Sequence, residues 1–172
     1  RLPDGRIVIA NDGSKELLFF DSAGVYLHAV GRQGAAPGEF QYLVAMWLCG
    51  DSLRVYDGRL SGFSVFDRDG RFARSFQVRL PDRAQPPANI DCNDDGRLIL
   101  SDWGDPSTRG QVYRPIITVM VTDPNGGIAD TVGAFPGHQY VRGFTSAPVF
   151  GMHTTIRVAG DQAYIGTADR YE

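Results

Sequence analysis

One short turn-forming segment recurs three times along the chain and constrains its fold more than any other feature. The segment consists of aspartate, two variable residues and glycine, and it directly follows an apolar run at Asp21–Gly24, Asp67–Gly70 and Asp123–Gly126. In such a turn the aspartate side chain accepts backbone N–H groups, and the glycine supplies a positive φ without steric cost. Each copy therefore predicts a hairpin between two β-strands.

The spacing of these turns predicts a repeating unit of several strands. The aspartates that open the turns lie 46 and 56 residues apart. A second polar residue ends the strand that precedes each unit's turn, at Asn11, Asp57 and Asp102, with spacings of 46 and 45 residues. A period in the forties with about four strands per unit is typical of a β-propeller blade. The longer third interval places an insertion between Asp102 and Asp123.

Thirteen short apolar runs bounded by Asp, Gly, Asn and Pro predict strands, and helical periodicity is absent nearly everywhere. In chain order they group as three, four, four and two strands. The predicted strands are Arg6–Ala10, Leu17–Phe20, Val25–Val30, Leu43–Leu48, Leu53–Tyr56, Phe63–Phe66, Phe72–Phe76, Ala88–Cys92, Leu98–Ser101, Ile116–Thr122, Ile128–Val132, Thr155–Val158 and Gln162–Thr167.

These strands predict an all-β propeller with four-stranded antiparallel blades. Because the grouping is not a whole number of blades, we expect the chain to form about half of a larger propeller domain. The expected divisions are a partial blade at residues 1–36, a blade at 37–81, a blade at 82–135, an inter-blade segment at 136–153 and a partial blade at 154–172.

The segment from Gly31 to Phe40 is expected to join the outer strand of one blade to the inner strand of the next. Its glycines and proline suit a link that does not compete for sheet pairing, and Phe40 is expected to fill the gap between blades. Together with Val55–Asp57 and Val65–Phe72, this segment resembles an NHL-type repeat. The family's usual proline after the Gly-Glu-Phe segment is absent. The resemblance implies a six-bladed propeller of the secreted bacterial kind, with an extracytoplasmic location.

Composition excludes several function classes. The net charge is −3 and no cluster of Lys and Arg is dense enough to predict a nucleic-acid partner. No apolar run of about 18 residues is present, so no membrane-spanning segment is expected. Neither a phosphate-binding Gly-Lys loop nor a Gly-x-Ser-x-Gly elbow occurs. The two cysteines, Cys49 and Cys92, leave open whether they form a single disulfide.

Two loop regions carry the residue types favoured at binding surfaces. They are the insertion after Asp102 and the long link at residues 136–153, which the expected topology places on the same face of the propeller. The alternative is that the aromatic residues of the insertion only cover the third blade. The candidate ligand-binding residues are Trp103, Asp105, Arg109, Tyr113, Tyr140 and Arg142.

The sequence patterns that would indicate a metal site are weaker than those that indicate a binding surface. Oxygen-bearing residues at Asp91, Asn93, Asp95 and Asp102 match most of a calcium loop, but strands rather than helices are expected on both sides of it. The same residues are explained by a hairpin turn and a blade marker, so no cofactor is predicted and calcium stays an alternative. His138 and His153 flank the long link and could approach each other.

We expect a non-catalytic binding or scaffold propeller that presents loops on one face to a protein or carbohydrate partner. One alternative is a metal-dependent lactonase or lyase-type propeller enzyme with a site on the ring axis, as the resemblance allows. Another is a structural subunit of a surface assembly. The rest of its own propeller is also an expected partner, because apolar residues are expected on the end faces: Ile7, Ile9, Leu18, Tyr164 and Ile165.

Overall fold

The computed structural model describes residues 1–80, 87–104, 111–142 and 151–168, and all regular structure in these ranges is β-strand. With no helix among them, the described residues also offer no apolar helix that could cross a membrane. The chain divides into two compact units. The first contains residues 1–78 and 94–96, and the second contains residues 79–93 and 97–172.

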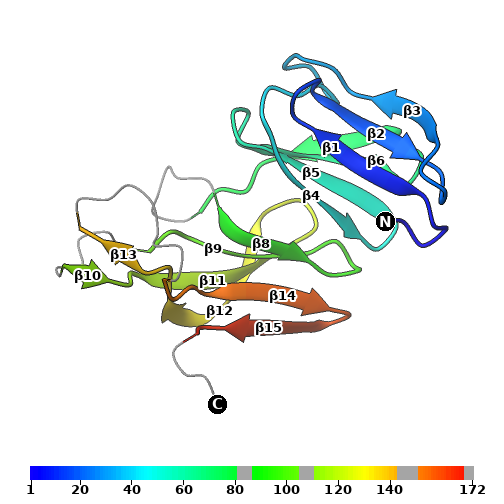
Figure 1. The fold of residues 1–172 in the computed structure, drawn as a ribbon. Coiled ribbons are helices and arrows are strands. Elements are labelled where there is room, and N and C mark those ends of the chain that lie inside the picture. Colours follow the sequence, from blue (N-terminus) through cyan, green and yellow to red (C-terminus); the bar gives the residue numbers. More distant parts are fainter. Residues whose placement is uncertain (81–86, 105–110, 143–150, 169–172) are drawn as a thin grey trace. The chain divides into compact units, whose positions relative to one another are not determined.

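The first unit contains two antiparallel sheets built from consecutive hairpins (Figure 1). One sheet has the order β1-β2-β3, and the other has the order β4-β5-β6-β7. The strands are β1 (Ile7–Asn11), β2 (Glu16–Phe20), β3 (Tyr26–Val30), β4 (Leu43–Cys49), β5 (Ser52–Asp57), β6 (Gly62–Asp67) and β7 (Phe72–Phe76). Neighbouring strands follow one another in sequence, as the turn pattern predicts.

The second unit contains a four-stranded sheet of order β12-β11-β9-β8 and a β14-β15 hairpin. A separate two-stranded sheet pairs β10 with β13. The strands are β8 (Ala88–Cys92), β9 (Leu98–Ser101), β10 (Val112–Tyr113), β11 (Ile116–Thr122), β12 (Ile128–Pro136), β13 (Tyr140–Val141), β14 (Thr155–Ala159) and β15 (Gln162–Gly166). All thirteen predicted strands are present, and β10 and β13 are the additional ones.

The recurring aspartates cap their turns as predicted. The Oδ1 atom of Asp67 accepts the backbone N–H groups of Asp69 at 2.8 Å and Arg71 at 2.9 Å. Asp21 and Asp123 accept the same two N–H groups, two and four residues further along the chain. The glycine that closes each turn has a φ between 82° and 92°. These turns are thus specified by local side-chain to backbone bonds.

Asp57 has a different structural role, because its carboxylate is buried rather than exposed. Its Oδ2 atom accepts the N–H groups of Gln41 and Tyr42, and its Oδ1 atom accepts those of Arg59 and Leu60. One carboxylate therefore satisfies four backbone donors from two separate segments. This holds the link before β4 against the turn between β5 and β6.

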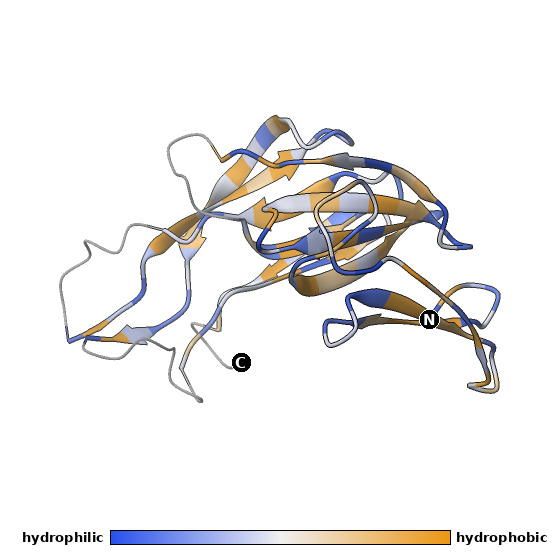
Figure 2. Cartoon of the chain, turned by 90° about the horizontal axis from the view of Figure 1, so that it is seen from above, coloured by the Kyte–Doolittle hydropathy of each residue, from blue (hydrophilic) through white to orange (hydrophobic). Residues whose placement is uncertain are grey.

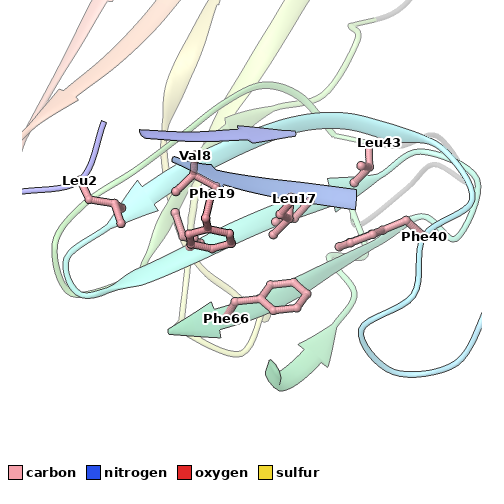
Figure 3. Packing of buried hydrophobic residues seen from close by; sticks show 9 residues of the cluster. Leu2, Val8, Leu17, Phe19, Phe40, Leu43 and Phe66 are labelled. Atoms are coloured by element: carbon pink, nitrogen blue, oxygen red, sulfur yellow. The ribbon is translucent and has the colours of Figure 1, made fainter. Parts of the chain in front are cut away.

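An apolar core lies between the two sheets of the first unit (Figure 3). Phe40 is fully buried there, and its ring lies 5.8 Å from that of Phe66. The prediction that Phe40 fills this gap is confirmed. The other members of the cluster come from the N-terminal segment and strands of both sheets: Leu2, Val8, Leu17, Phe19, Leu43, Leu53 and Val55. Figure 2 shows hydrophobic residues concentrated on the strands.

A second core lies within the second unit, where β14 packs against β8 and β9. Its buried residues are Ile99, Ile117, Val119 and Ile156. A hydrogen bond between a side chain and the backbone adds to this contact, because the Oδ2 atom of Asp91 accepts the N–H of Val158 at 2.9 Å.

The predicted end-face residues are only partly covered. On one face of the first sheet, Ile7 pairs with Phe20 and Ile9 with Leu18. Ile9 is 49 % exposed, and the other three side chains are half-buried. In the second unit Tyr164 is 56 % exposed, and Ile165 packs at the edge of the second core. Apolar sheet faces of this kind are normally covered by a neighbour.

The buried position of Phe40 gives a first stability prediction. Phe40→Ala should lower the free energy of unfolding by about 3–5 kcal/mol, because it removes a fully buried ring and leaves a cavity. Tyr42→Ala is the matched control, since this ring is 54 % exposed, and it should cost less than about 1 kcal/mol. Urea unfolding measures both values. Similar losses in the two variants would contradict this account of the core.

The different roles of Asp67 and Asp57 predict that their replacement lowers the free energy of unfolding by different amounts. Asp67→Ala should cost about 1 kcal/mol, because it removes bonds at a partly exposed turn where water can replace them. Asp57→Ala should cost more, about 2–3 kcal/mol, because buried donors are left without an acceptor. The measurement is again urea unfolding. A loss at Asp57 no larger than at Asp67 would show that burial of the carboxylate is unimportant.

Candidate functional site

The strands β10 and β13 bring the insertion and the long link together (Figure 1). Val112 pairs with Val141 and Tyr113 with Tyr140 in antiparallel register. The backbone N–H of Arg142 extends the pairing by donating to the carbonyl of Gln111 at 2.8 Å. Two segments separated by an entire hairpin of the larger sheet therefore form one surface.

The aromatic side chains of this small sheet are in contact. The rings of Tyr113 and Tyr140 are stacked, with centroids 5.7 Å apart and an angle of 26° between the planes. Both rings are half-buried. Burial and the neighbouring Tyr113 raise the pKa of Tyr140, so its hydroxyl stays neutral and able to donate a hydrogen bond. We call Tyr113, Tyr140 and Arg142 the tyrosine surface.

Of the three remaining sequence candidates, the structure describes one. Trp103 is 42 % exposed and follows β9. Asp105 and Arg109 lie outside the described residues. Arg142 is exposed and directly follows β13, two residues after Tyr140. The structure thus brings three of the six candidates together.

Arg114, which the sequence does not single out, directly follows β10 and supports this surface. Its guanidinium donates to three carbonyl oxygens, to one hydroxyl and to one thioether sulfur. The acceptors are Gly137 O at 2.9 Å, Pro136 O at 3.3 Å, Thr167 O at 2.7 Å, Thr154 Oγ1 at 3.4 Å and Met152 Sδ at 3.6 Å. Arg114 therefore fixes the two ends of the long link relative to β10.

The two histidines of the long link lie near each other, as the sequence allowed. The ring centroids of His138 and His153 are 6.2 Å apart and the rings are nearly parallel. The neighbouring backbone holds them there, because Gln139 N–H donates to Met152 O and Met152 N–H donates to the side chain of Gln139. Burial, His153 and Arg114 together lower the pKa of His138, with burial the largest cause.

Three of the four candidate calcium residues accept hydrogen bonds from backbone N–H groups with their side-chain oxygens. Asp91 accepts from Cys92 and Val158, and Asn93 accepts from Arg97. The Oδ1 atom of Asp102 accepts from Gly104 and Thr118, and Asp95 is exposed in its turn. Within the described ranges, no three His, Cys, Asp or Glu side chains are grouped so as to hold a metal ion.

A hollow of about 420 Å³ in the first unit is a further candidate that sequence reasoning missed. It lies between residues 35–39 of the link and strands β6 and β7. Its two carboxylates are engaged in structural bonds. Glu39 binds Arg32 and the N–H of Ala36, and Asp57 accepts its four backbone donors. The tyrosine surface is therefore the better candidate.

The sheets, their repeated turns and the loops that they carry define a β-propeller protein. The family described as 6-bladed β-propeller has a model that matches residues 1–89, which is just over half of the chain. The chain belongs to this family. This confirms the propeller expectation, whereas the narrower resemblance to NHL-type repeats stays a prediction.

Solved structures show the same fold. A candidate exported protein from Bacteroides fragilis is similar with a TM-score of 0.58 and 16 % identity, over 96 % of this chain and 48 % of that one. A protein of unknown function from Bacteroides caccae has a TM-score of 0.50 and 14 % identity, over 77 % and 47 %. The chain thus spans about half the length of either protein. No curated protein matches the chain.

The environment of His138 predicts a pH dependence. Its lowered pKa means that the unfolded chain takes up this proton at a higher pH than the folded chain. The contribution to stability is therefore complete above the ordinary histidine pKa of about 6.5 and is lost as the pH falls through that range. His138→Gln should flatten the fall in melting temperature on acidification. An NMR titration that places His138 at or above its ordinary pKa would contradict this prediction.

Proposed function

We propose that the chain belongs to a non-catalytic binding propeller that presents the tyrosine surface to a carbohydrate or protein partner. The observation that carries the proposal is the pairing of β10 with β13, which stacks Tyr113 on Tyr140 outside the larger sheets. Tyrosines that are rigid and partly exposed supply contact area at a low cost in conformational entropy. Exposed arginine beside them is also a residue type favoured at binding hot spots.

The two tyrosines have no evident role in the blades themselves. Neither belongs to the two apolar cores described above, which are built from other strands. The enzyme alternative has less support, because a catalytic zinc site needs three protein ligands. The described part of the link places two histidines together. A binding surface accounts for more of the geometry.

Binding measurements with a pair of variants test this proposal. The full chain is screened against a glycan array and against cell-surface protein fractions, and any hit is then measured with purified ligand. Tyr113→Ala and Tyr140→Ala should each weaken binding at least about tenfold, the usual effect of a hot-spot residue. Tyr42→Ala, which alters an exposed tyrosine of the first unit, is the matched control and should bind normally.

A ligand whose binding is unaffected by both surface variants would contradict the proposal, because it would show that the partner contacts another part of the propeller. Melting curves of the variants distinguish lost contacts from lost folding.

We also propose an extracytoplasmic location in a bacterium. The chain has two cysteines, and Cys49 and Cys92 are both disulfide-bonded. Disulfides persist in oxidising compartments such as the bacterial periplasm and cell surface and are rare in the cytosol. The similarity to a candidate exported protein from Bacteroides fragilis agrees with this.

The disulfide gives a separate prediction. Replacing both cysteines by serine should lower the free energy of unfolding by about 2–4 kcal/mol, because the bridge restricts the unfolded chain. Urea unfolding with and without dithiothreitol measures the effect, and the reductant should not affect the double variant. A wild-type midpoint that is unchanged by reductant would argue against a stabilising bridge and weaken the proposed location.

A further inference from the structure

The described segments around the tyrosine surface carry positive and neutral side chains. The described segments that form it and its support are residues 111–115, 136–142 and 151–154. They contain Arg114, His138, Arg142 and His153 and no aspartate or glutamate. The chain as a whole has a net charge of −3, with 20 acidic residues. These described segments are therefore positive, whereas the chain as a whole is acidic.

Arg114 and Arg142 have different structural roles. Arg114 directs its guanidinium at five acceptors within the protein, so it contributes a fixed positive charge rather than a ligand contact. Arg142 is exposed and directly follows β13, two residues after Tyr140, and its backbone N–H donates to the carbonyl of Gln111. A guanidinium in this position can bind a carboxylate through two parallel N–H···O bonds.

The tyrosine pair favours a ring-shaped ligand unit. The faces of sugar rings present C–H groups, which pack on aromatic faces through dispersion. The pairing of β10 with β13 fixes both tyrosines before binding, so little side-chain freedom is lost when a ligand is bound. An acidic peptide would match the charges, but its glutamate or aspartate side chains offer no flat apolar face for the rings.

We infer that the tyrosine surface binds an acidic polysaccharide whose sugar units carry carboxylates. A sugar ring packs on the tyrosine pair, and its carboxylate binds Arg142. The inference rests on the proposed function, because it names the ligand class of that same surface. No covalent step is involved.

The test compares three probes by calorimetry with the full chain. They are oligogalacturonate, its uncharged methyl ester of the same length, and a poly-glutamate peptide. Oligogalacturonate should bind at least about tenfold more tightly than the methyl ester, since a guanidinium forms stronger hydrogen bonds with a carboxylate than with a neutral ester. Added salt should weaken binding of the acidic probe and leave the ester unchanged.

Variants test whether Arg142 provides the charge that binds the acidic probe. Arg142→Gln should remove the preference for the acidic probe without affecting the ester, and Arg142→Lys should restore part of it. Tyr113→Ala should weaken binding of both sugars. Arg157→Gln changes an exposed arginine on β14 and is the matched control, with no expected effect.

The outcomes that overturn the inference differ from those that overturn the proposed function. Equal binding of acid and ester, with loss of both in Tyr113→Ala, overturns the acidic ligand and retains a carbohydrate-binding surface. Poly-glutamate that binds as tightly as oligogalacturonate, with the same dependence on Arg142, overturns the sugar in favour of an acidic peptide. Failure of all three probes overturns the inference, and the array experiment then decides the proposed function independently.

Discussion

A sheet that carries apolar side chains on both faces is stabilised by a packing partner on either side. The first sheet illustrates this, since Leu17 and Phe19 on one face are fully buried in the core that also contains Phe40. On its other face Ile9 and Leu18 pair with each other and remain partly exposed. At about 25 cal/mol per Å² of buried apolar area, a sheet that is covered on both faces gains more stabilisation than one that is covered on a single face. In a repeating structure, neighbouring units can cover one another's faces.

Polar residues at the strand ends make that repetition possible without weakening the core. Exposed aspartates such as Asp67 satisfy the N–H groups of their own hairpin, whereas the buried Asp57 joins a hairpin to the link that precedes the sheet. A buried carboxylate is tolerated there because four donors replace the water that it loses. The same side-chain chemistry thus serves turn formation in one place and tertiary connection in another.

Most of the fold could be predicted because its determinants are local. An aspartate, a glycine and an apolar run are enough to identify a hairpin, and all thirteen strands predicted in this way are present. The strands β10 and β13 were missed because each has two residues and the paired residues lie 27 and 29 positions apart, so neither strand has a periodic pattern.

The candidate site was only partly visible in the sequence for a related reason. Tyrosine and arginine in long loops indicated a surface, and the structure brings Tyr113, Tyr140 and Arg142 together. Arg114 gave no signal, because three of its acceptors are main-chain carbonyls, which every residue carries. Its role appears only when the strands are placed in space.

The bonds of Arg114 to main-chain carbonyls have a consequence for how such a surface diversifies. The bonds to carbonyl oxygens do not depend on which side chains stand at those positions, whereas the bonds to the Thr154 hydroxyl and the Met152 sulfur do. The loops can exchange their outward-facing residues, in natural variation or in the laboratory, while the guanidinium keeps their ends in register. Arg114 is therefore the residue to retain when the outward-facing residues of these segments are exchanged.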